Sequence, residues 1–321
     1  MGAKGTDWAD REHRKSVVDT RRFLWRDDTV EMHAKWLGLS DGMSMLDLGC
    51  GTGYVGRTWW RFCGPGGSYT GVDISAPLLV EGSEKSTDWI PAGRAAFVRA
   101  DAGSLPFDDG TFDWTVCQTL LMHMEHPEHI LAEMIRVTRP GGVVSCNEPD
   151  NKVSMTAGGY DSFPEPTIEE DLLCLRVARH WIEGRRRLGL GDWTIGPKVP
   201  VMMQRLGLED VDIRVDDMVG LLQPPYDTPG MQFRMKQIRE SIRQGRKLGD
   251  DWGRDPAQRE FRRLFFAGGG TEHIWRKYFG LRRRQCLERI PELAGQLRRR
   301  TYFCCPAACS FFSIRGRKPA G

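Results

Sequence analysis

Three glycines close behind an aspartate form the part of this sequence best suited to bind a ligand. Residues 47–53 read Asp-Leu-Gly-Cys-Gly-Thr-Gly, between a short apolar stretch and a segment with helical character. Glycines permit tight turns and let a ligand approach the backbone closely. The start of the following helix offers free N–H groups and a positive dipole end. With the charge of Asp47 nearby, the turn suits a ligand that carries both an ammonium and a carboxylate group.

The same glycines also satisfy the dinucleotide pattern G-x-G-x-x-G, so a nicotinamide cofactor is the first alternative. Gly51, Gly53 and Gly56 meet the pattern. Asp73 follows Gly51 by 22 residues, near the spacing of a ribose-binding acid. Asp47 argues against this alternative, because a carboxylate beside the turn would repel a pyrophosphate.

The elements that must position these residues alternate between strands and helices. The predicted order is a strand at 45–48, a helix at 54–61, strands at 68–75, 95–102 and 112–119, a helix at 127–138 and a strand at 143–146. This alternation predicts a mostly parallel sheet with both faces covered. Ligands of such sheets bind at the carboxyl ends of the strands.

The order of motifs from residue 47 to residue 146 resembles the class I S-adenosylmethionine-dependent methyltransferases. Within them it is most similar to the subgroup that includes the ubiquinone and menaquinone biosynthesis enzymes. The resemblance rests on the D-x-G-x-G-x-G run, on the strand that ends at Asp73, on Asp101 before Leu-Pro-Phe, and on Arg-Pro-Gly-Gly at 139–142. It implies an α/β, Rossmann-like fold with a seven-stranded, mostly parallel sheet that finishes in an antiparallel edge hairpin.

The resemblance also implies S-adenosyl-L-methionine as the cofactor. It places the ribose hydroxyls at Asp73, the adenine amine at Asp101 and the methionine end near Gln118. Each charge-assisted hydrogen bond to Asp73 would contribute about 1.5–3 kcal/mol. The full set of expected cofactor-binding residues is Asp47, Gly49, Gly51, Gly53, Asp73, Ile74, Asp101, Ala102 and Gln118.

Methyl transfer from a sulfonium depends on alignment of the nucleophile and sometimes on a base. Candidate bases follow the fourth and fifth strands, at the carboxyl edge of the sheet. We predict Glu148 as a substrate contact or base, and His123 as the second candidate. A structural role remains the alternative for both, and His126 directly before Pro127 could simply start the helix.

Segments before and after the motifs complete the expected domain. Residues 1–40 are predicted to be helical; in the resembling family such a preface partly covers the cofactor, and covering one sheet edge is the alternative. Helices are predicted at 168–188 and 199–206, and strands at 211–215 and 310–315. The methyltransferase domain is therefore expected to span 41–215 and 301–318.

The interval 216–300 is expected to be a helical insertion before the last strand. It holds 19 Lys and Arg against 11 Asp and Glu, a local charge of +8, with helices predicted at 231–247, 259–266 and 271–289. We interpret it as a cap over the substrate. The alternatives are a solvated face of amphipathic helices and a surface for RNA or an acidic protein.

Composition narrows the remaining possibilities. The net charge of +3 does not require a polyanionic partner, and nucleic acid is not expected. No apolar run approaches the roughly 18 residues of a membrane span, and the polar N-terminus lacks the core of a signal peptide. Nine scattered cysteines predict reduced thiols in a cytoplasmic protein. Cys304, Cys305 and Cys309 lack zinc spacing and are expected to pack, so no metal site is predicted.

The expected function is methyl transfer by in-line displacement to a small organic acceptor with an O, N, C or S nucleophile. The cofactor half of the site is common to all four, so the sequence leaves the acceptor atom open. It gives no indication of an oligomeric state. Two alternatives remain: an RNA or protein methyltransferase that uses the basic insertion as a clamp, and a non-catalytic regulator that binds the cofactor.

Overall fold

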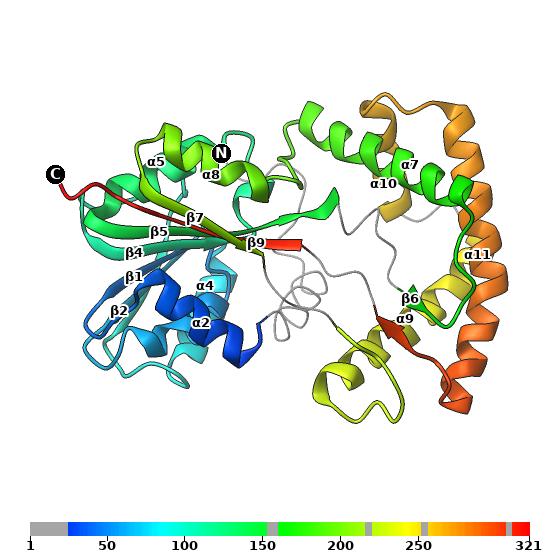
Figure 1. Cartoon of the computed structure of the whole chain (residues 1–321), viewed down its shortest axis with the longest axis horizontal. Helices are drawn as coiled ribbons and strands as arrows, with labels where there is room; N and C mark the ends of the chain where they lie inside the picture. Colours follow the sequence, from blue (N-terminus) through cyan, green and yellow to red (C-terminus); the bar gives the residue numbers. More distant parts are fainter. Residues whose placement is uncertain (1–24, 153–159, 216–219, 252–255, 306–309) are drawn as a thin grey trace. The chain divides into compact units, whose positions relative to one another are not determined.

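The computed structural model describes five stretches of the chain, which fall into two compact units (Figure 1). The described residues are 25–152, 160–215, 220–251, 256–305 and 310–321. The first unit takes residues up to 150 together with 189–217 and 310–321, and the second takes 151–188 and 218–309. Residues 1–24 of the expected N-terminal segment and Cys309 lie outside the described residues.

A seven-stranded sheet forms the centre of the first unit. Its strands are β1 (Ser44–Leu48), β2 (Ser68–Asp73), β3 (Ala95–Arg99), β4 (Phe112–Gln118), β5 (Thr138–Asp150), β7 (Glu209–Val215) and β9 (Ser310–Arg317). Their order across the sheet is β3-β2-β1-β4-β5-β9-β7. Strands β1 to β5 pair in parallel, whereas β9 is antiparallel to both of its neighbours. The predicted Rossmann-like sheet with an antiparallel edge pair is confirmed.

Helices cover both faces of this sheet, as Figure 1 shows. Helices α5 (Pro127–Val137) and α8 (Val199–Arg205) pack on one face, and α2 (Asp27–Leu37) and α3 (Tyr54–Trp59) pack on the other. Helix α4 (Ala76–Ser86) lies against β3. The two layers allow each strand to bury alternate side chains on opposite sides.

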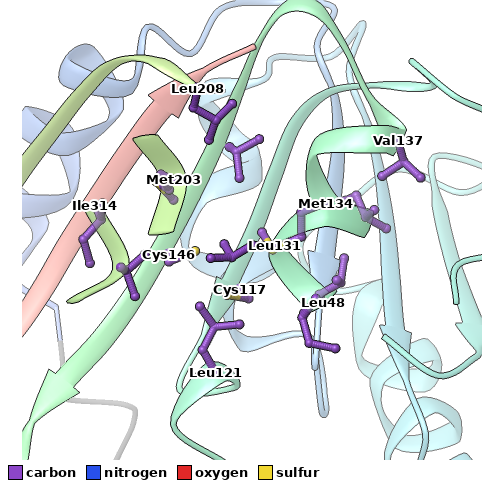
Figure 2. Close-up of a cluster of buried hydrophobic side chains, with 14 of the residues drawn as sticks. Leu48, Cys117, Leu121, Leu131, Met134, Val137, Cys146, Met203, Leu208 and Ile314 are labelled. Atoms are coloured by element: carbon purple, nitrogen blue, oxygen red, sulfur yellow. The ribbon is translucent and has the colours of Figure 1, made fainter. Parts of the chain in front are cut away.

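The core on the α5 face is built from side chains in register on neighbouring strands (Figure 2). Leu48, Cys117, Cys146 and Ile314 occupy paired positions on β1, β4, β5 and β9, and all are fully buried. Helix α5 covers them with Leu131, Met134 and Val137, which recur every three residues and so lie along one helix face. This packing fixes the register of neighbouring strands. It therefore also fixes where their carboxyl ends lie relative to one another.

The second unit is mainly helical and encloses apolar clusters of its own. It contains α7 (Ile168–Arg187), α9 (Pro229–Asp251), α10 (Pro256–Ala267), α11 (Glu272–Arg299) and a small sheet of β6 (Tyr160–Asp161) and β8 (Cys304–Cys305). Helices α7 and α10 meet at two glycines. A Cβ on Gly184 would lie 1.8 Å from the carbonyl oxygen of Leu264, and one on Gly268 would lie 1.8 Å from that of His180. Only glycine permits this approach of the two backbones.

The largest differences from the predicted boundaries occur at three places. Strand β5 spans 138–150 rather than 143–146, because it pairs with both β4 and β9. Helix α11 continues through Pro291 to residue 299 instead of ending at 289, because Leu293 and Leu297 beyond the proline pack against buried Tyr302. Residues 151–188, which we assigned to the methyltransferase domain, belong to the second unit, because α7 packs on α10 and α11.

Cys304 and the Pro-Pro-Tyr turn at 224–226 both take part in the packing of the second unit. Cys304 exchanges two backbone hydrogen bonds of 2.8 Å with Leu222, and it packs against the cluster around Tyr226 and Tyr302. The Tyr226 hydroxyl, in the Pro-Pro-Tyr turn, donates to the Tyr302 carbonyl oxygen at 2.7 Å. Within the described residues, no group of three or more His, Cys, Asp or Glu side chains is placed to hold a metal ion. No helix in that part of the chain is long and apolar enough to cross a membrane.

Candidate functional site

The glycine turn connects β1 to α3 and is anchored to the end of β2. Gly49, Gly51 and Gly53 have φ angles of 68°, 54° and 78°, the left-handed region that favours glycine. The N–H groups of Gly49 and Cys50 both donate to the carbonyl oxygen of Val72, at 2.8 and 3.0 Å. The backbone of the turn is therefore held at the carboxyl edge of the sheet.

Two glycines of this turn differ in the free space beside their Cα atoms. A Cβ on Gly49 would lie 3.0 Å from the Leu120 side chain, whereas a Cβ on Gly51 would meet no atom within 4 Å. Gly49 is therefore required by its neighbours as well as by its backbone angle. Gly51 presents open backbone to space that a ligand can enter.

Asp73 joins the turn to β2 through both of its carboxylate oxygens. Oδ2 accepts from the Gly51 N–H at 2.9 Å, and Oδ1 accepts from the Ser75 N–H at 2.8 Å. Each oxygen has further acceptor capacity, because an ionised carboxylate offers about four lone-pair sites. Ile74 follows directly and is 48% exposed. A carboxylate acceptor and an apolar surface thus stand side by side at the end of β2.

Asp47 lies beneath the turn and is only 1% exposed. Its Oδ2 accepts a hydrogen bond of 2.9 Å from the Tyr69 hydroxyl. Burial, and then the charge of Asp47, raise the pKa of the Tyr69 phenol well above its usual value. The same two causes, with Asp73 adding to them, raise the pKa of the Cys50 thiol. Asp47 and Asp73 therefore give the glycine turn a negative electrostatic environment, which favours a cationic group on a ligand.

The expected adenine contacts follow β3 in a tight loop. The Ala100 N–H donates to the Asp73 carbonyl oxygen at 3.3 Å, which brings the start of this loop next to Asp73. Asp101 Oδ1 accepts from the Gly103 N–H at 2.9 Å and so holds the turn that also contains Ala102. Both residues are partly exposed. The structure therefore brings them to the same edge as the glycine turn.

Gln118 is the last residue of β4 and is 3% exposed. Its Oε1 accepts from the Trp25 indole N–H at 3.2 Å. Because an indole can only donate, this bond fixes the orientation of the amide. Among the described residues, Nε2 of Gln118 has no hydrogen-bond partner. A buried amide donor is thus left over beside the glycine turn.

The chain turns sharply after Gln118. Thr119 has a φ of 51°, a left-handed conformation that is strained for a β-branched residue. Such strain costs on the order of 1–3 kcal/mol and is concentrated at functional sites. Its N–H donates to the Asn147 carbonyl oxygen at 2.9 Å, which keeps the turn against β5.

Glu148, which we predicted as a base or substrate contact, is enclosed by backbone N–H groups. It is 0% exposed. Its Oε1 accepts from the N–H groups of Leu120 and Leu121, at 2.8 Å each, and its Oε2 accepts from that of Met122 at 3.3 Å. These three hydrogen bonds attach the loop after β4 to strand β5 through the Glu148 carboxylate. The geometry favours a positioning role over proton transfer.

His123 is carried by the short helix η2 (Leu121–His123) that Glu148 holds. Its ring meets Trp193 edge-on, with the ring centroids 6.3 Å apart. Trp193 packs with the core on the α5 face, whereas Trp25, which binds Gln118, packs on the α2 face. His126 is the N-cap residue of α5, in agreement with the structural alternative considered for it. His123 thus remains a candidate base, placed at the edge of the sheet by Glu148.

Two polar side chains near this edge had not been predicted. Asn147 of β5 and Ser313 of β9 are 8% and 2% exposed. Ser313 Oγ has no hydrogen-bond partner in the part of the chain that the structure describes. Asn147 precedes Glu148 in the sequence, but a single serine in a final strand gives no sequence signal.

Comparison with known proteins supports the same interpretation of this half of the chain. A family model described as a methyltransferase domain matches residues 46–146. The segment from β1 into β5 is therefore similar to a methyltransferase domain. It includes the glycine turn, Asp73, Asp101 and Gln118, so the expected resemblance is confirmed.

Curated relatives of this segment include bacterial enzymes. The ubiquinone/menaquinone biosynthesis C-methyltransferase UbiE of Stutzerimonas stutzeri (strain A1501) is 36% identical over 143 residues, which are 44% of this chain and 54% of that protein. The enzyme of the same name from Pseudomonas paraeruginosa (strain DSM 24068 / PA7) is 34% identical over the same shares. The chain spans about half the length of these relatives. A crystal structure of a putative methyltransferase from Bacillus halodurans C-125 aligns with 91% of this chain and 99% of its own, at 13% identity and a TM-score of 0.46.

The edge residues of the methyltransferase domain suit S-adenosylmethionine. The open backbone at Gly51 and the spare amide donor of Gln118 match a carboxylate. Asp73 keeps acceptor capacity for hydroxyls, and the exposed Ile74 offers an apolar surface to a base. Since the negative environment of the turn also favours an ammonium group, each part of the cofactor has a chemically matched residue.

Proposed function

We propose that this chain transfers the methyl group of S-adenosyl-L-methionine to a small organic acceptor. The observation that carries the proposal is the glycine turn, which Asp73 ties to β2 and which leaves open backbone at Gly51. It lies within the segment that matches a methyltransferase domain. The relatives named as C-methyltransferases support a small-molecule acceptor over a macromolecule.

Each cofactor group is assigned to residues on the same edge of the sheet. Gly49, Gly51, Gly53 and Gln118 would receive the methionine carboxylate, with Asp47 supplying negative potential for the ammonium group. When bound, S-adenosylmethionine supplies a sulfonium methyl group for in-line displacement by the acceptor. The remaining assignments are the ribose to Asp73 and the adenine to Ile74, Asp101 and Ala102.

Catalysis by the protein is proposed to consist mainly of alignment. Glu148 would hold the loop after β4 in place through its three backbone N–H contacts, and that loop carries His123. His123 would accept a proton from the acceptor where the nucleophile needs it. Alignment alone can contribute much of the rate enhancement, because it converts a bimolecular step into an intramolecular one.

The basic insertion gives less support to an RNA or protein acceptor. Several of its arginines are engaged in ion pairs within the second unit. Arg284 contacts Glu170 at 2.5 Å, Arg263 contacts Glu260 at 2.7 Å and Arg299 contacts Glu292 at 2.9 Å. Paired, exposed arginines of this kind are typical of a solvated helix surface. The role of residues 216–300 as a substrate cap, and of residues 1–40 as a lid, stays a prediction.

Methyl-labelled S-adenosylmethionine, incubated with the purified protein and a cell extract, tests the proposal. Label should enter the small-molecule fraction, resist ribonuclease and disappear with the Asp73→Ala variant. Label in RNA or protein would contradict the proposed acceptor class. No label despite tight cofactor binding would favour a regulator.

We also propose a cytoplasmic location. The eight cysteines among the described residues are all free thiols, which a reducing compartment preserves. Cell fractionation with an antibody against the chain would test this directly.

A further inference from the structure

The strands of the methyltransferase domain place a row of polar residues level with the glycine turn. Leu48 pairs with Val72 and Cys117, so the residues that follow them, Gly49, Asp73 and Gln118, share one level. Gln118 pairs with Asn147 of β5, and Asn147 pairs with Ser313 of β9. The row therefore continues from the cofactor-binding residues across two more strands, β5 and β9.

The side chains of Gln118, Asn147 and Ser313 point to the same face of the sheet. Directly paired residues on neighbouring strands always share a face. Their face is the one that packs against α2 and α3, where Trp114 and Val116 of β4 are buried. Neighbouring strands are about 4.8 Å apart, so the row extends about 10 Å from Gln118 to Ser313. That is the span of a small organic molecule.

Two members of the row have unused hydrogen-bonding capacity. The Gln118 amide is oriented by Trp25, which leaves Nε2 as a donor without a partner among the described residues. Ser313 Oγ is buried and also lacks a partner there. A buried polar group without a hydrogen bond is rare in folded proteins and unfavourable. Two in one row, next to a cofactor turn, therefore indicate a ligand that completes them.

The next row toward the interior of the sheet shows the contrast. Ser145, two residues before Asn147 on the same face of β5, accepts a hydrogen bond of 2.8 Å from the Trp114 indole N–H. Thr115 and Thr138, on the opposite face, also bond to each other at 2.8 Å. The fold thus satisfies these deeper hydroxyls and leaves open the one at the carboxyl edge.

We propose that Asn147 and Ser313 form the acceptor subsite and bind a hydroxyl or carbonyl oxygen of the methyl acceptor. This inference rests on the proposed function. Gln118 marks the cofactor end of the row, so an acceptor held by Asn147 and Ser313 lies next to the methionine end of the cofactor. Ser313 can donate or accept and Asn147 can do both, which suits an oxygen-bearing group. A purely hydrocarbon acceptor would leave these groups unpaired.

The substitution Ser313→Ala tests the subsite, with Ser145→Ala as its matched control. Both remove one hydroxyl from a buried serine on the same face. The probe is the small-molecule fraction of a cell extract, supplied together with methyl-labelled S-adenosylmethionine. The amount of extract is varied, and the amount that gives half-maximal incorporation of label is determined. Calorimetry gives the dissociation constant for S-adenosylmethionine, and thermal denaturation gives the unfolding midpoint.

Ser313→Ala is expected to raise the half-saturating amount of extract about tenfold, the effect of one lost hydrogen bond. Its affinity for S-adenosylmethionine should stay within about twofold of wild type, and its unfolding midpoint should stay the same or rise. Ser145→Ala should show the reverse pattern, with a lower midpoint and an unchanged extract requirement. The two variants should therefore differ in which quantity changes, and this distinguishes a role in acceptor binding from a role in folding.

Two results would overturn the subsite while leaving the proposed function in place. One is a Ser313→Ala variant with the same extract requirement as wild type. The other is a Ser313→Ala variant whose midpoint falls as far as that of Ser145→Ala, which would make the hydroxyl structural. Failure of the wild-type protein itself to label any small molecule would instead reject the proposed function, and the subsite with it.

Discussion

The Asp73 carboxylate accepts a hydrogen bond of 2.9 Å from the backbone N–H of Gly51. One side chain at the end of β2 therefore holds the central residue of the glycine turn after β1. The same carboxylate is the proposed acceptor for the ribose hydroxyls. Asp73 thus holds the turn and is also proposed to bind the ligand, so a substitution should impair both roles together.

Replacing Asp73 by alanine should weaken binding of S-adenosylmethionine by about 10- to 100-fold. The variant loses charge-assisted hydrogen bonds of about 1.5–3 kcal/mol each. Isothermal titration of the cofactor measures the change. Asp88→Ala, at an exposed position, serves as the control and should bind as wild type does. Unchanged affinity in Asp73→Ala would show that the ribose assignment is wrong.

Gly51→Ala should separate backbone strain from loss of ligand space when it is compared with Gly93→Ala. Both glycines have positive φ angles, 54° and 80°, and a Cβ on either would meet no atom within 4 Å. Each substitution should lower the free energy of unfolding by about 1–2 kcal/mol, the cost of a left-handed alanine. Only the methyl group at position 51 would enter the proposed cofactor space.

Cofactor titration of the two variants therefore tests the location of the site. Gly51→Ala should bind S-adenosylmethionine at least about tenfold more weakly than Gly93→Ala. Equal affinities would mean that the open space beside Gly51 is not occupied by the cofactor. Urea unfolding of both variants verifies that the strain is matched.

Glu148→Gln should destabilise the protein, because three backbone N–H groups point at the carboxylate. Glutamine keeps one oxygen and turns an NH₂ group toward a donor, so we expect a loss of about 2–3 kcal/mol in the free energy of unfolding. Urea denaturation measures this, with the exposed Glu84→Gln as control.

Turnover distinguishes the positioning role of Glu148 from the base that the sequence suggested. Since Glu148 positions η2, the Glu148→Gln variant should turn over more slowly with an unchanged pH profile of kcat/KM. A general base would leave stability intact and remove the acid limb of that profile. This second pattern would restore the original assignment.

The fold and the cofactor half of the site were predictable because their signals are local. A strand, a glycine turn and a helix start lie within ten residues of Asp47, and their geometry follows from residue types. The alternation of elements then required a parallel sheet. The seven strands and the antiparallel pair at the edge were expected from the family resemblance.

The rest of the site depends on which distant residues meet. Glu148 has the sequence position of a base at a strand end, but three N–H groups of the preceding loop enclose it. Ser313 lies 166 residues after Asn147, and only the strand register pairs them. The predicted helix ended at residue 289, but packing of Leu293 and Leu297 accompanies its continuation through Pro291 to residue 299. In each case long-range packing overrode a local signal.

Tyr69→Phe should change how stability depends on pH, because the Tyr69 hydroxyl donates to Asp47 at 2.9 Å. Burial, and then Asp47, raise the pKa of this phenol well above its ordinary value of 10.0. The folded protein therefore keeps the proton where the unfolded chain has lost it. As a result, the stabilisation is complete below about pH 10 and decreases as pH rises, by up to about 1.4 kcal/mol per pH unit.

The phenylalanine variant lacks this titration as well as the hydrogen bond. At about pH 8 it should be less stable than wild type by about 1.5–3 kcal/mol, the range for a bond to a charged acceptor. The difference should narrow as pH rises above about 10, because only wild type loses the contribution of Tyr69. Urea unfolding followed by circular dichroism at several pH values measures both effects. Stability curves that run parallel over this range would show that Tyr69 does not hold its proton against Asp47.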